Sequence, residues 1–319
     1  MGQSIVANDL CVLIATKDRT NELNELLFSI ASSTLIPKKV LIVSSGTNIS
    51  HFKSKYSQKI DLEIIHSDVS GQSFQKSIGI NLLSSNYEWI LFLDDDVVLE
   101  SSTLEILYNE YITNPIFKSY LGFGLGITNR GTRNQNRTFK YVLRQFNLFS
   151  DTPGSITKSG HAQSYLDHGV QIEVDWLNGI SAWNSKVLSH YSSRQISIPY
   201  SAYEDVAFSY KVSKRHKLLF VPRARVQNQK MDGGSPLTLN QFVCGGYSRY
   251  KFVFDNIELS KKWLLVTQII RGADFIFRKN QSCNIFTRIK VAIKLWISLA
   301  ILAVRNKNSD ENLAAISQN

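Results

Sequence analysis

The feature that most constrains the fold is an apolar run that ends in three consecutive acids, Trp89–Leu93 followed by Asp94–Asp96. Five hydrophobic residues in a row predict a strand buried on both faces, which belongs in the middle of a mainly parallel sheet. The acids then lie at the carboxyl end of that strand, where open α/β sheets bind ligands. Because three adjacent negative charges repel one another, the first hypothesis is a site that binds a cation.

The alternative for these acids is structural. Acid runs after strands also occur in solvated loops and at the start of helices, and Ser101–Thr103 could open such a helix a few residues later.

Composition narrows the class of protein. The chain of 319 residues can bury a sizeable core, and its three cysteines, without a paired CxxC spacing, indicate a reducing compartment and argue against a disulfide scaffold or a zinc site. The first nine residues do not resemble a secretory signal, and the longest apolar run, Leu295–Val304, is about half the length that spans a bilayer.

Charge is distributed unevenly along the chain. Residues 1–206 carry 17 Lys and Arg against 20 Asp and Glu, whereas residues 207–319 carry 19 against 6. The carboxyl-terminal third is therefore expected to meet something anionic, with nucleic acid or a membrane surface as the candidates.

The first hundred residues alternate strands with helices. Three buried-strand patterns precede the central one, at 10–16, 40–43 and 62–65, and apolar residues at helical spacing predict helices after the first strand and before residue 88. This order predicts a doubly wound parallel sheet with right-handed crossovers. The loops after its strands then open on one edge, across which a nucleotide could lie.

The middle of the chain gives weaker signals. The segment 111–150 has no acid but has six bases, which fit either a solvated loop or a clamp for a phosphate or headgroup. The six bases are Lys118, Arg130, Arg133, Arg137, Lys140 and Arg144. Alternation predicts a half-buried strand over 171–177, and a further strand is expected over 217–221, ending at Pro222.

Two acids, Glu204 and Asp205, begin a predicted helix that ends in Lys214 and Arg215. Acids in the first turn and bases in the last suit the helix dipole, so a purely structural role would explain the pair.

From Lys261 onward, aromatic and aliphatic residues alternate with Lys and Arg at helical spacing. This pattern is typical of helices that lie in a membrane interface, and ordinary packing against the rest of the protein is the alternative.

Five separated segments, in their order and spacing, resemble family 2 glycosyltransferases of the GT-A fold over roughly residues 9 to 255. The segments are Leu13–Arg19, Gly71–Gly79, Leu93–Asp96 as the DXD motif, Trp176–Gly179 and Tyr203–Asp205.

The resemblance implies an α/β fold, with a Rossmann-like, mainly parallel sheet flanked by helices. The pattern of the tail adds a C-terminal helical appendage at a membrane interface. Residues 1–258 are expected to form the catalytic domain, with a nucleotide-sugar half over about 1–127 and an acceptor half over about 128–258. Residues 259–319 are expected to form the basic amphipathic tail.

The resemblance also assigns roles on the donor side. The metal, Mn or Mg, is expected on Asp96 and Asp94, where it neutralises the leaving diphosphate. Asp94 and Asp95 are also expected at the donor. The remaining donor-binding residues implied are Thr16, Asp18, Ser44 and Lys76.

On the acceptor side, the resemblance implies that Asp205 is the general base of an inverting displacement, with Glu204 as the lesser candidate. Trp176, Asn178 and Gly179 are expected to contact the acceptor.

The sequence departs from the family pattern at three places. The second strand ends in Ser44 and Ser45, where aspartates usually meet the base, and Gln75–Ser77 replaces Ala-Arg-Asn but keeps a cation at Lys76. Arg225–Gln229 contains no histidine to complete a metal shell. The nucleotide therefore stays open, and water or diphosphate would complete the metal's coordination.

The main interpretation is a metal-dependent hexosyltransferase that extends a surface polysaccharide, acting on a glycan or polyprenyl-diphosphate-linked acceptor. It would be cytoplasmic and peripheral on the cytoplasmic face of the membrane. A non-catalytic sugar-nucleotide-binding or assembly subunit of the same fold is the alternative. Nucleic-acid binding is not expected, because the basic residues alternate with large apolar ones and no binding motif occurs. The oligomeric state stays open.

Overall fold

A computed structural model of the chain describes residues 5–128, 150–166, 168–189, 191, 203–229, 238–277, 283–310 and 312. The chain divides into two compact units, the first of Met1–Gly131, Tyr165–Arg194 and Phe208–Asp232, the second of Thr132–Ser164, Gln195–Ala207 and Gly233–Asn319. The expected domain boundary at residue 258 stays a prediction. Five of the six bases expected in a loop or clamp, Arg130, Arg133, Arg137, Lys140 and Arg144, lie outside the described residues.

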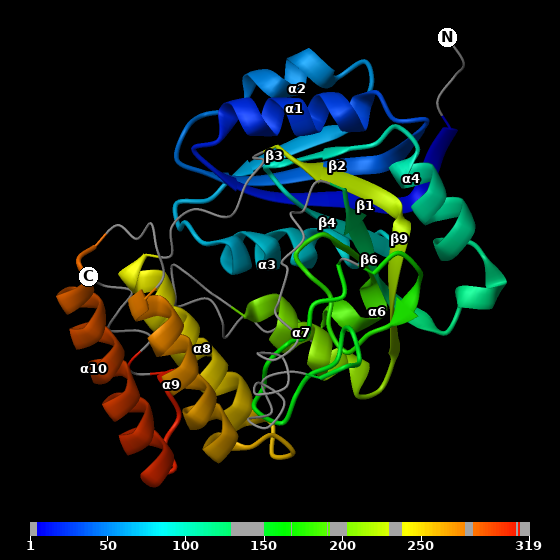
Figure 1. Ribbon diagram of the computed structural model, residues 1–319. Helices are drawn as coiled ribbons and strands as arrows, with labels where there is room; N and C mark the ends of the chain where they lie inside the picture. Colours follow the sequence, from blue (N-terminus) through cyan, green and yellow to red (C-terminus); the bar gives the residue numbers. More distant parts are fainter. Residues whose placement is uncertain are drawn as a thin grey trace. The chain divides into compact units, whose positions relative to one another are not determined.

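The first unit is built on a sheet whose described strands number nine, in the order β3-β2-β1-β4-β8-β6-β9-β5, with β7 paired to β9 (Figure 1). The strands are β1 Ile5–Lys17, β2 Leu35–Ser45, β3 Leu62–His66, β4 Trp89–Asp94, β5 Val97–Leu99, β6 Tyr120–Ile127, β7 Ile172–Glu173, β8 Ser181–Asn184 and β9 Lys217–Asn228. The helices that connect them are α1 Thr20–Ala31, α2 His51–Tyr56, α3 Gln72–Leu83, α4 Thr103–Glu105, η1 Ile106–Ile112, η2 Pro115–Phe117 and α6 Ser185–Leu188.

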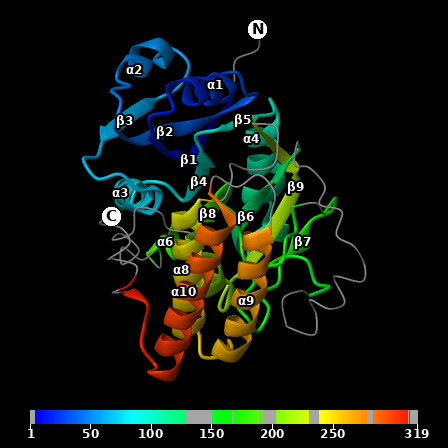
Figure 2. The ribbon, with the colours of Figure 1, turned by 60° about the vertical axis from the view of Figure 1, so that its left-hand side comes forward.

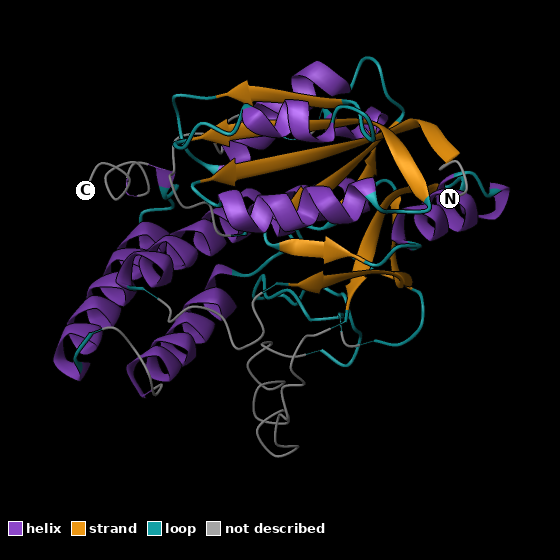
Figure 3. Ribbon diagram, turned by 90° about the horizontal axis from the view of Figure 1, so that it is seen from above, coloured by secondary structure: helices purple, strands orange, loops and turns teal. Residues whose placement is uncertain are grey.

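The four strands β3, β2, β1 and β4 are parallel to one another, which confirms the predicted parallel sheet (Figure 3). Thr16 pairs with Ser44 across β1 and β2, and Ala15 pairs with Asp94 across β1 and β4. The register therefore brings the carboxyl ends of three strands to one edge, where the polar residues of the candidate site begin.

Helices cover both faces of this parallel half. Val12 and Ile14 of β1 pack in one core cluster with Leu23 and Leu26 of α1, while Leu13 packs on the opposite face with residues of α3. On that face α3 lies very close to the strand, because a Cβ atom added at Gly79 would come within 2.2 Å of the Leu13 side chain. Alternate residues of one buried strand thus serve two helix layers, as in a doubly wound fold.

Beyond β4 the sheet becomes mixed, because β8 runs antiparallel to both β4 and β6. The expectation that a strand ends at Pro222 was wrong. β9 continues to Asn228. In its pairing with β6, Val221 lies opposite Leu125 but the next paired residue, opposite Gly126, is Arg225, so residues 222–224 are left unpaired in a bulge. Pro222 lies in the bulge so formed, where a missing N–H breaks no ladder bond. The strand expected over 171–177 is short, since only Ile172–Glu173 pairs.

The second unit contains three long helices, α8 Leu239–Asp255, α9 Lys261–Phe277 and α10 Ile285–Val304, and the start of α7, Glu204–Ser213. Figure 2 shows α8, α9 and α10 running alongside one another. Thr238 opens α8 with a reciprocal capping box to Gln241. The aromatic rings of Phe242 and Phe275 stack between α8 and α9 with centroids 4.2 Å apart. None of the helices in the described part combines the length and apolar content needed to cross a bilayer.

One face of α10 packs on its neighbours and the other is exposed. Leu295 and Leu299 are buried, and Leu295 lies against Gly246 of α8. The exposed face carries apolar residues at helical spacing, namely Phe286, Ile293, Ile297, Ile301 and Val304. Lys290 and Lys294 are exposed on the same side of α10 as these apolar residues, so this helix does not separate apolar from basic residues as expected for the tail. Membrane binding by the tail stays a prediction.

Candidate functional site

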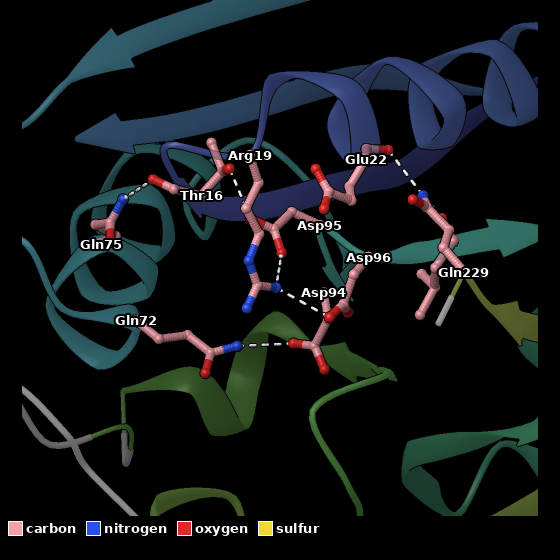
Figure 4. A network of polar contacts seen from close by, with 10 residues as sticks. Thr16, Arg19, Glu22, Gln72, Gln75, Asp94, Asp95, Asp96 and Gln229 are labelled. Atoms are coloured by element: carbon pink, nitrogen blue, oxygen red, sulfur yellow. Dashed lines mark hydrogen bonds and ion pairs between the residues drawn. The ribbon is translucent and has the colours of Figure 1, made fainter. Parts of the chain in front are cut away.

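The three acids lie at the carboxyl end of β4, beside the end of β1 (Figure 4). Asp95 points inward and is only 6% exposed, and its carboxylate accepts a hydrogen bond of 2.7 Å from the hydroxyl of Thr16. Burial raises the pKa of Asp95 even though Thr16 and Arg19 stabilise its charged form. Asp94 and Asp96 are partly exposed on either side of it.

Arg19, in the loop after β1, was not predicted as a site residue. Its Nη1 atom lies 2.8 Å from a carboxylate oxygen of Asp95 and 2.9 Å from one of Asp96. Burial opposes its charge, but the carboxylates of Asp95 and Asp96 raise its pKa overall. One sequence signal could have identified Arg19 as a site residue. It is a base next to Asp18, in the loop after the first strand.

Two glutamines of α3 fix the edge of the sheet. Gln72 donates a 2.7 Å hydrogen bond to the carboxylate of Asp94. Gln75 is buried, and its Nε2 atom donates to the carbonyl groups of Thr16 and Val43, both at 2.7 Å. Gln75 therefore holds the ends of β1 and β2 together where the sequence departs from the family pattern.

The carboxylate of Asp18 is hydrogen-bonded to the loop that follows β2. Its Oδ1 atom accepts hydrogen bonds of 2.9 Å from the backbone N–H and from the hydroxyl of Thr47, and these bonds lower the pKa of Asp18. Gly46 has a φ of +79°, and a Cβ atom there would lie 2.2 Å from Asp18. The expected donor contact of Asp18 stays a prediction, but its position is set by these two loops.

The other residues expected to bind the nucleotide-sugar donor, and Ser45 beside them, are buried. Ser44 and Ser45 are buried at the end of β2, and Ser44 donates to the carbonyl of Ile65 at 3.4 Å. Lys76 is fully buried, with its ammonium 5.5 Å from the ring centre of Phe92. Its predicted contact with a phosphate is not tested by this placement.

Gln229 follows β9 and is the last residue of the segment Arg225–Gln229, which lacks the histidine expected from the family pattern. Its backbone N–H donates to the carbonyl of Asp96 at 2.9 Å, and its side chain donates to the carbonyl of Glu22 at 2.8 Å (Figure 4). It positions the chain around Asp96 rather than adding a nitrogen ligand.

The acids fit a hard cation that keeps part of its water. Asp94 and Asp96 offer partly exposed carboxylate oxygens at one strand end, which is the type of ligand that Mg²⁺ and Mn²⁺ prefer. No group of three or more His, Cys, Asp or Glu side chains gathers for a metal among the described residues. A metal there would need water or phosphate oxygens, and Asp96 would have to exchange its contact with Arg19.

The three residues expected at the acceptor also lie in the first unit. Trp176 packs edge-on against Tyr165 with ring centres 5.0 Å apart, and the N–H of Asn178 donates to the hydroxyl of Tyr165 at 2.9 Å. Gly179 follows in the buried turn that leads to β8. Tyr165 therefore orders this segment, although sequence reasoning did not single it out.

Glu204 and Asp205 form the first turn of α7 and are counted with the second unit. Glu204 is buried and Asp205 is partly exposed. Tyr203 precedes them with a φ of +80°, a strained conformation for a residue with a side chain. The Tyr203 hydroxyl accepts from the N–H of Ala162 at 2.9 Å and donates to the carbonyl of Gly160. The strained backbone is thus held in place directly before the acid pair.

Residues 11–166 match the family model described as "Glycosyl transferase family 2". No curated protein matches the chain in sequence.

Solved structures share the fold at low identity. S. aureus TarS 1–349 in complex with UDP-GlcNAc has a TM-score of 0.57 and 13% identity, over 97% of this chain and 90% of that one. The mannosyltransferase PcManGT from Pyrobaculum calidifontis in complex with GDP-Man and Mn²⁺ has a TM-score of 0.50 and 12% identity, over 96% and 78%. The chain spans 44% of the longer TarS structure. These likenesses confirm the GT-A fold.

Proposed function

We propose, on the premise that residues 11–166 belong to glycosyl transferase family 2, that the protein is an inverting glycosyltransferase. It moves a sugar from a nucleotide-sugar donor to a hydroxyl group of a glycan or lipid-linked acceptor in surface polysaccharide biosynthesis. The observation that carries the proposal is the cluster of Asp94, Asp95 and Asp96 beside Thr16, at the carboxyl end of a parallel sheet.

Asp94 and Asp96 are the residues that would hold Mn²⁺ or Mg²⁺. Bound there, the cation would supply positive charge to the departing diphosphate. Asp95 has a different task, because its buried carboxylate is engaged by Thr16 and Arg19. It holds the loop after β1 against the end of β4, so that Thr16 and Asp18 face the donor.

Asp205 is proposed as the general base. A carboxylate that removes the proton of the acceptor hydroxyl allows direct displacement at the anomeric carbon, which inverts its configuration. Asp205 is partly exposed, as a base that must reach an acceptor requires, whereas the buried Glu204 suits a supporting role. Trp176, Asn178 and Gly179 are proposed to contact the acceptor sugar.

A membrane surface is the proposed place of action, on the cytoplasmic face. The exposed apolar face of α10, with Lys290 and Lys294 beside it, would enter the headgroup layer of an anionic membrane. Residues 259–319 are proposed to act as this peripheral anchor and residues 1–258 as the catalytic domain.

The membrane proposal is tested with the double variant Ile293→Ser, Ile297→Ser. It should lose binding to vesicles that contain anionic phospholipid, while Ile116→Ser, which removes an exposed isoleucine of the first unit, should bind normally. Equal sedimentation of both variants with vesicles would refute the assignment of this face.

A non-catalytic sugar-nucleotide-binding subunit is the second candidate. It is favoured by Ser44 and Ser45 at the end of β2 and by the ion pairs of Arg19 with Asp95 and Asp96. Binding of a donor without turnover by the wild-type protein would identify it.

The test of the donor site is calorimetry with a panel of nucleotide sugars, with and without Mn²⁺. Asp96→Ala should abolish metal-dependent binding of the donor that the wild type prefers. Asp68→Ala is the matched control, because it removes an exposed carboxylate of the same unit. Donor affinity unchanged in Asp96→Ala would contradict the proposed metal site.

A further inference from the structure

Three side chains of the second unit bury nitrogen atoms that have no hydrogen-bond partner. These atoms are Nε and Nη1 of Arg249, Nε2 of Gln268 and Nδ1 of His161. Arg249 is 7% exposed and Gln268 is 1% exposed. Folded proteins rarely leave buried donors unpaired, so a group of them in one place calls for an acceptor that is added later.

Arg249 and Gln268 lie at the same level of a helical hairpin. α8 and α9 are joined by a short connection, and their phenylalanines, Phe242 and Phe275, stack on each other. Arg249 lies seven residues after Phe242, and Gln268 lies seven residues before Phe275. Seven residues are about two helical turns. Arg249 therefore lies on the same face of α8 as Phe242, and Gln268 on the same face of α9 as Phe275.

His161 joins the same cluster through Tyr203. The guanidinium of Arg249 lies 4.8 Å from the ring centre of Tyr203. The hydroxyl of that tyrosine contacts Gly160 and Ala162, the two neighbours of His161 in the chain. The imidazole is therefore held close to the guanidinium.

The cluster carries the positive charge of Arg249, and the unpaired nitrogen atoms of Arg249 and Gln268 are hydrogen-bond donors. No carboxylate forms an ion pair with Arg249 in the part of the chain that the structure describes. Burial and the charges of Arg249 and Arg271 lower the pKa of His161 to about 3, so its imidazole is neutral at physiological pH. Arg271 donates to Oε1 of Gln268 at 3.2 Å, which leaves the amide nitrogen of Gln268 as the atom that can meet a ligand.

We propose that Arg249, Gln268 and His161 form a binding site for a phosphate group, and that this phosphate belongs to the acceptor. A phosphate presents several strong acceptor oxygens, and a guanidinium binds two of them through neighbouring N–H groups. Arg249 keeps a small exposed surface, and His161 is partly exposed.

The assignment to the acceptor rests on the proposed function. Tyr203, against which Arg249 stacks, leads directly into Glu204 and Asp205. A phosphate held at Arg249 would therefore anchor an acceptor close to the proposed base. A polyprenyl diphosphate and a phosphate-containing glycan share this chemistry.

The site is tested first by calorimetry with inorganic pyrophosphate in the presence of a metal chelator. Arg249→Met should weaken binding by about tenfold or more, because it removes the charged donor. Lys262→Met, which removes an exposed cation of the same unit, should bind like the wild type. Equal affinity of Arg249→Met and the wild type would overturn the proposal.

Thermal melting separates binding from folding. Without pyrophosphate, Arg249→Met should melt at the temperature of the wild type or above it, because methionine replaces a buried unpaired charge. Gln268→Met keeps the size of the side chain and should bind pyrophosphate more weakly while it melts normally. Normal pyrophosphate affinity in both variants, or a lower melting temperature of ligand-free Arg249→Met, would show a structural role only.

Farnesyl diphosphate distinguishes the two sources of phosphate. A lipid-linked acceptor would be supported if farnesyl diphosphate binds more tightly than pyrophosphate and this binding is lost in Arg249→Met. A glycan phosphate would be supported if the two compounds bind equally and both depend on Arg249. Sugar transfer with an unchanged acceptor KM in Arg249→Met would overturn the acceptor role and leave the transferase standing. Arg249-dependent pyrophosphate binding by a protein that transfers no sugar would support the site while the proposed function fails.

Discussion

The depressed pKa of His161 makes the stability of the second unit depend on pH. Burial, with the charges of Arg249 and Arg271, lowers this pKa from 6.5 to about 3. Between these values the unfolded chain binds a proton that the folded protein does not. The free energy of unfolding therefore falls as the pH drops below about 6.5, and the lost stability returns as the pH rises.

The size of the effect follows from the two pKa values. At pH 5 a histidine that shifts from 6.5 to about 3 on folding costs about 2 kcal/mol relative to pH 8. His161→Gln removes this titration, so its stability should decrease less between pH 8 and pH 5, by about 2 kcal/mol.

The measurement is urea denaturation followed by circular dichroism at pH 8, 7, 6 and 5. His51→Gln is the control, because it replaces an exposed histidine of the first unit and should keep the acid sensitivity of the wild type. If His161→Gln loses as much stability at pH 5 as the wild type, the placement of a neutral imidazole beside two guanidinium groups is wrong.

Two further predictions concern the scaffold of the donor site. Gln75→Leu should lower the free energy of unfolding by about 3 kcal/mol in urea denaturation, because two buried carbonyl groups lose their donor, whereas exposed Gln58→Leu should change it by less than about 0.5 kcal/mol. A near-neutral Gln75→Leu would show that these bonds add nothing. Gly46→Ala should cost about 2 kcal/mol, measured in the same way, because alanine is strained at a positive φ and its Cβ would displace Asp18. Wild-type stability in that variant would mean that the two loops are not locked together.

The parallel half of the fold could be predicted because its signals are local. Buried strands read as continuous apolar runs, and the helix after the first strand shows a clear apolar stripe, so β1, β2, β3, β4 and α1 were recognised. The extension of β9 through Pro222 could not be read in this way, because it depends on a bulge against β6.

Some residues of the candidate site can also be recognised from local sequence, and others only from the folded structure. The acids after β4 and the pair at Glu204 and Asp205 stand out in the sequence because their residue types and order fit the proposed chemistry. Arg19 is different, since its role depends on contacts with residues 76 and 77 positions away. The unpaired donors of Arg249 and Gln268 likewise became visible only when two helices were packed together.

Inverting sugar transfer with Asp205 as the base is tested most directly by an assay of nucleotide release. The assay follows free nucleotide formed from the preferred nucleotide sugar, with Mn²⁺ and an acceptor present. The wild-type protein should release nucleotide and form a glycoside of inverted anomeric configuration. Asp205→Asn should bind the donor with unchanged affinity but release no nucleotide, because only the base is removed. Turnover by Asp205→Asn at the rate of the wild type, or a product of retained configuration, would contradict the account.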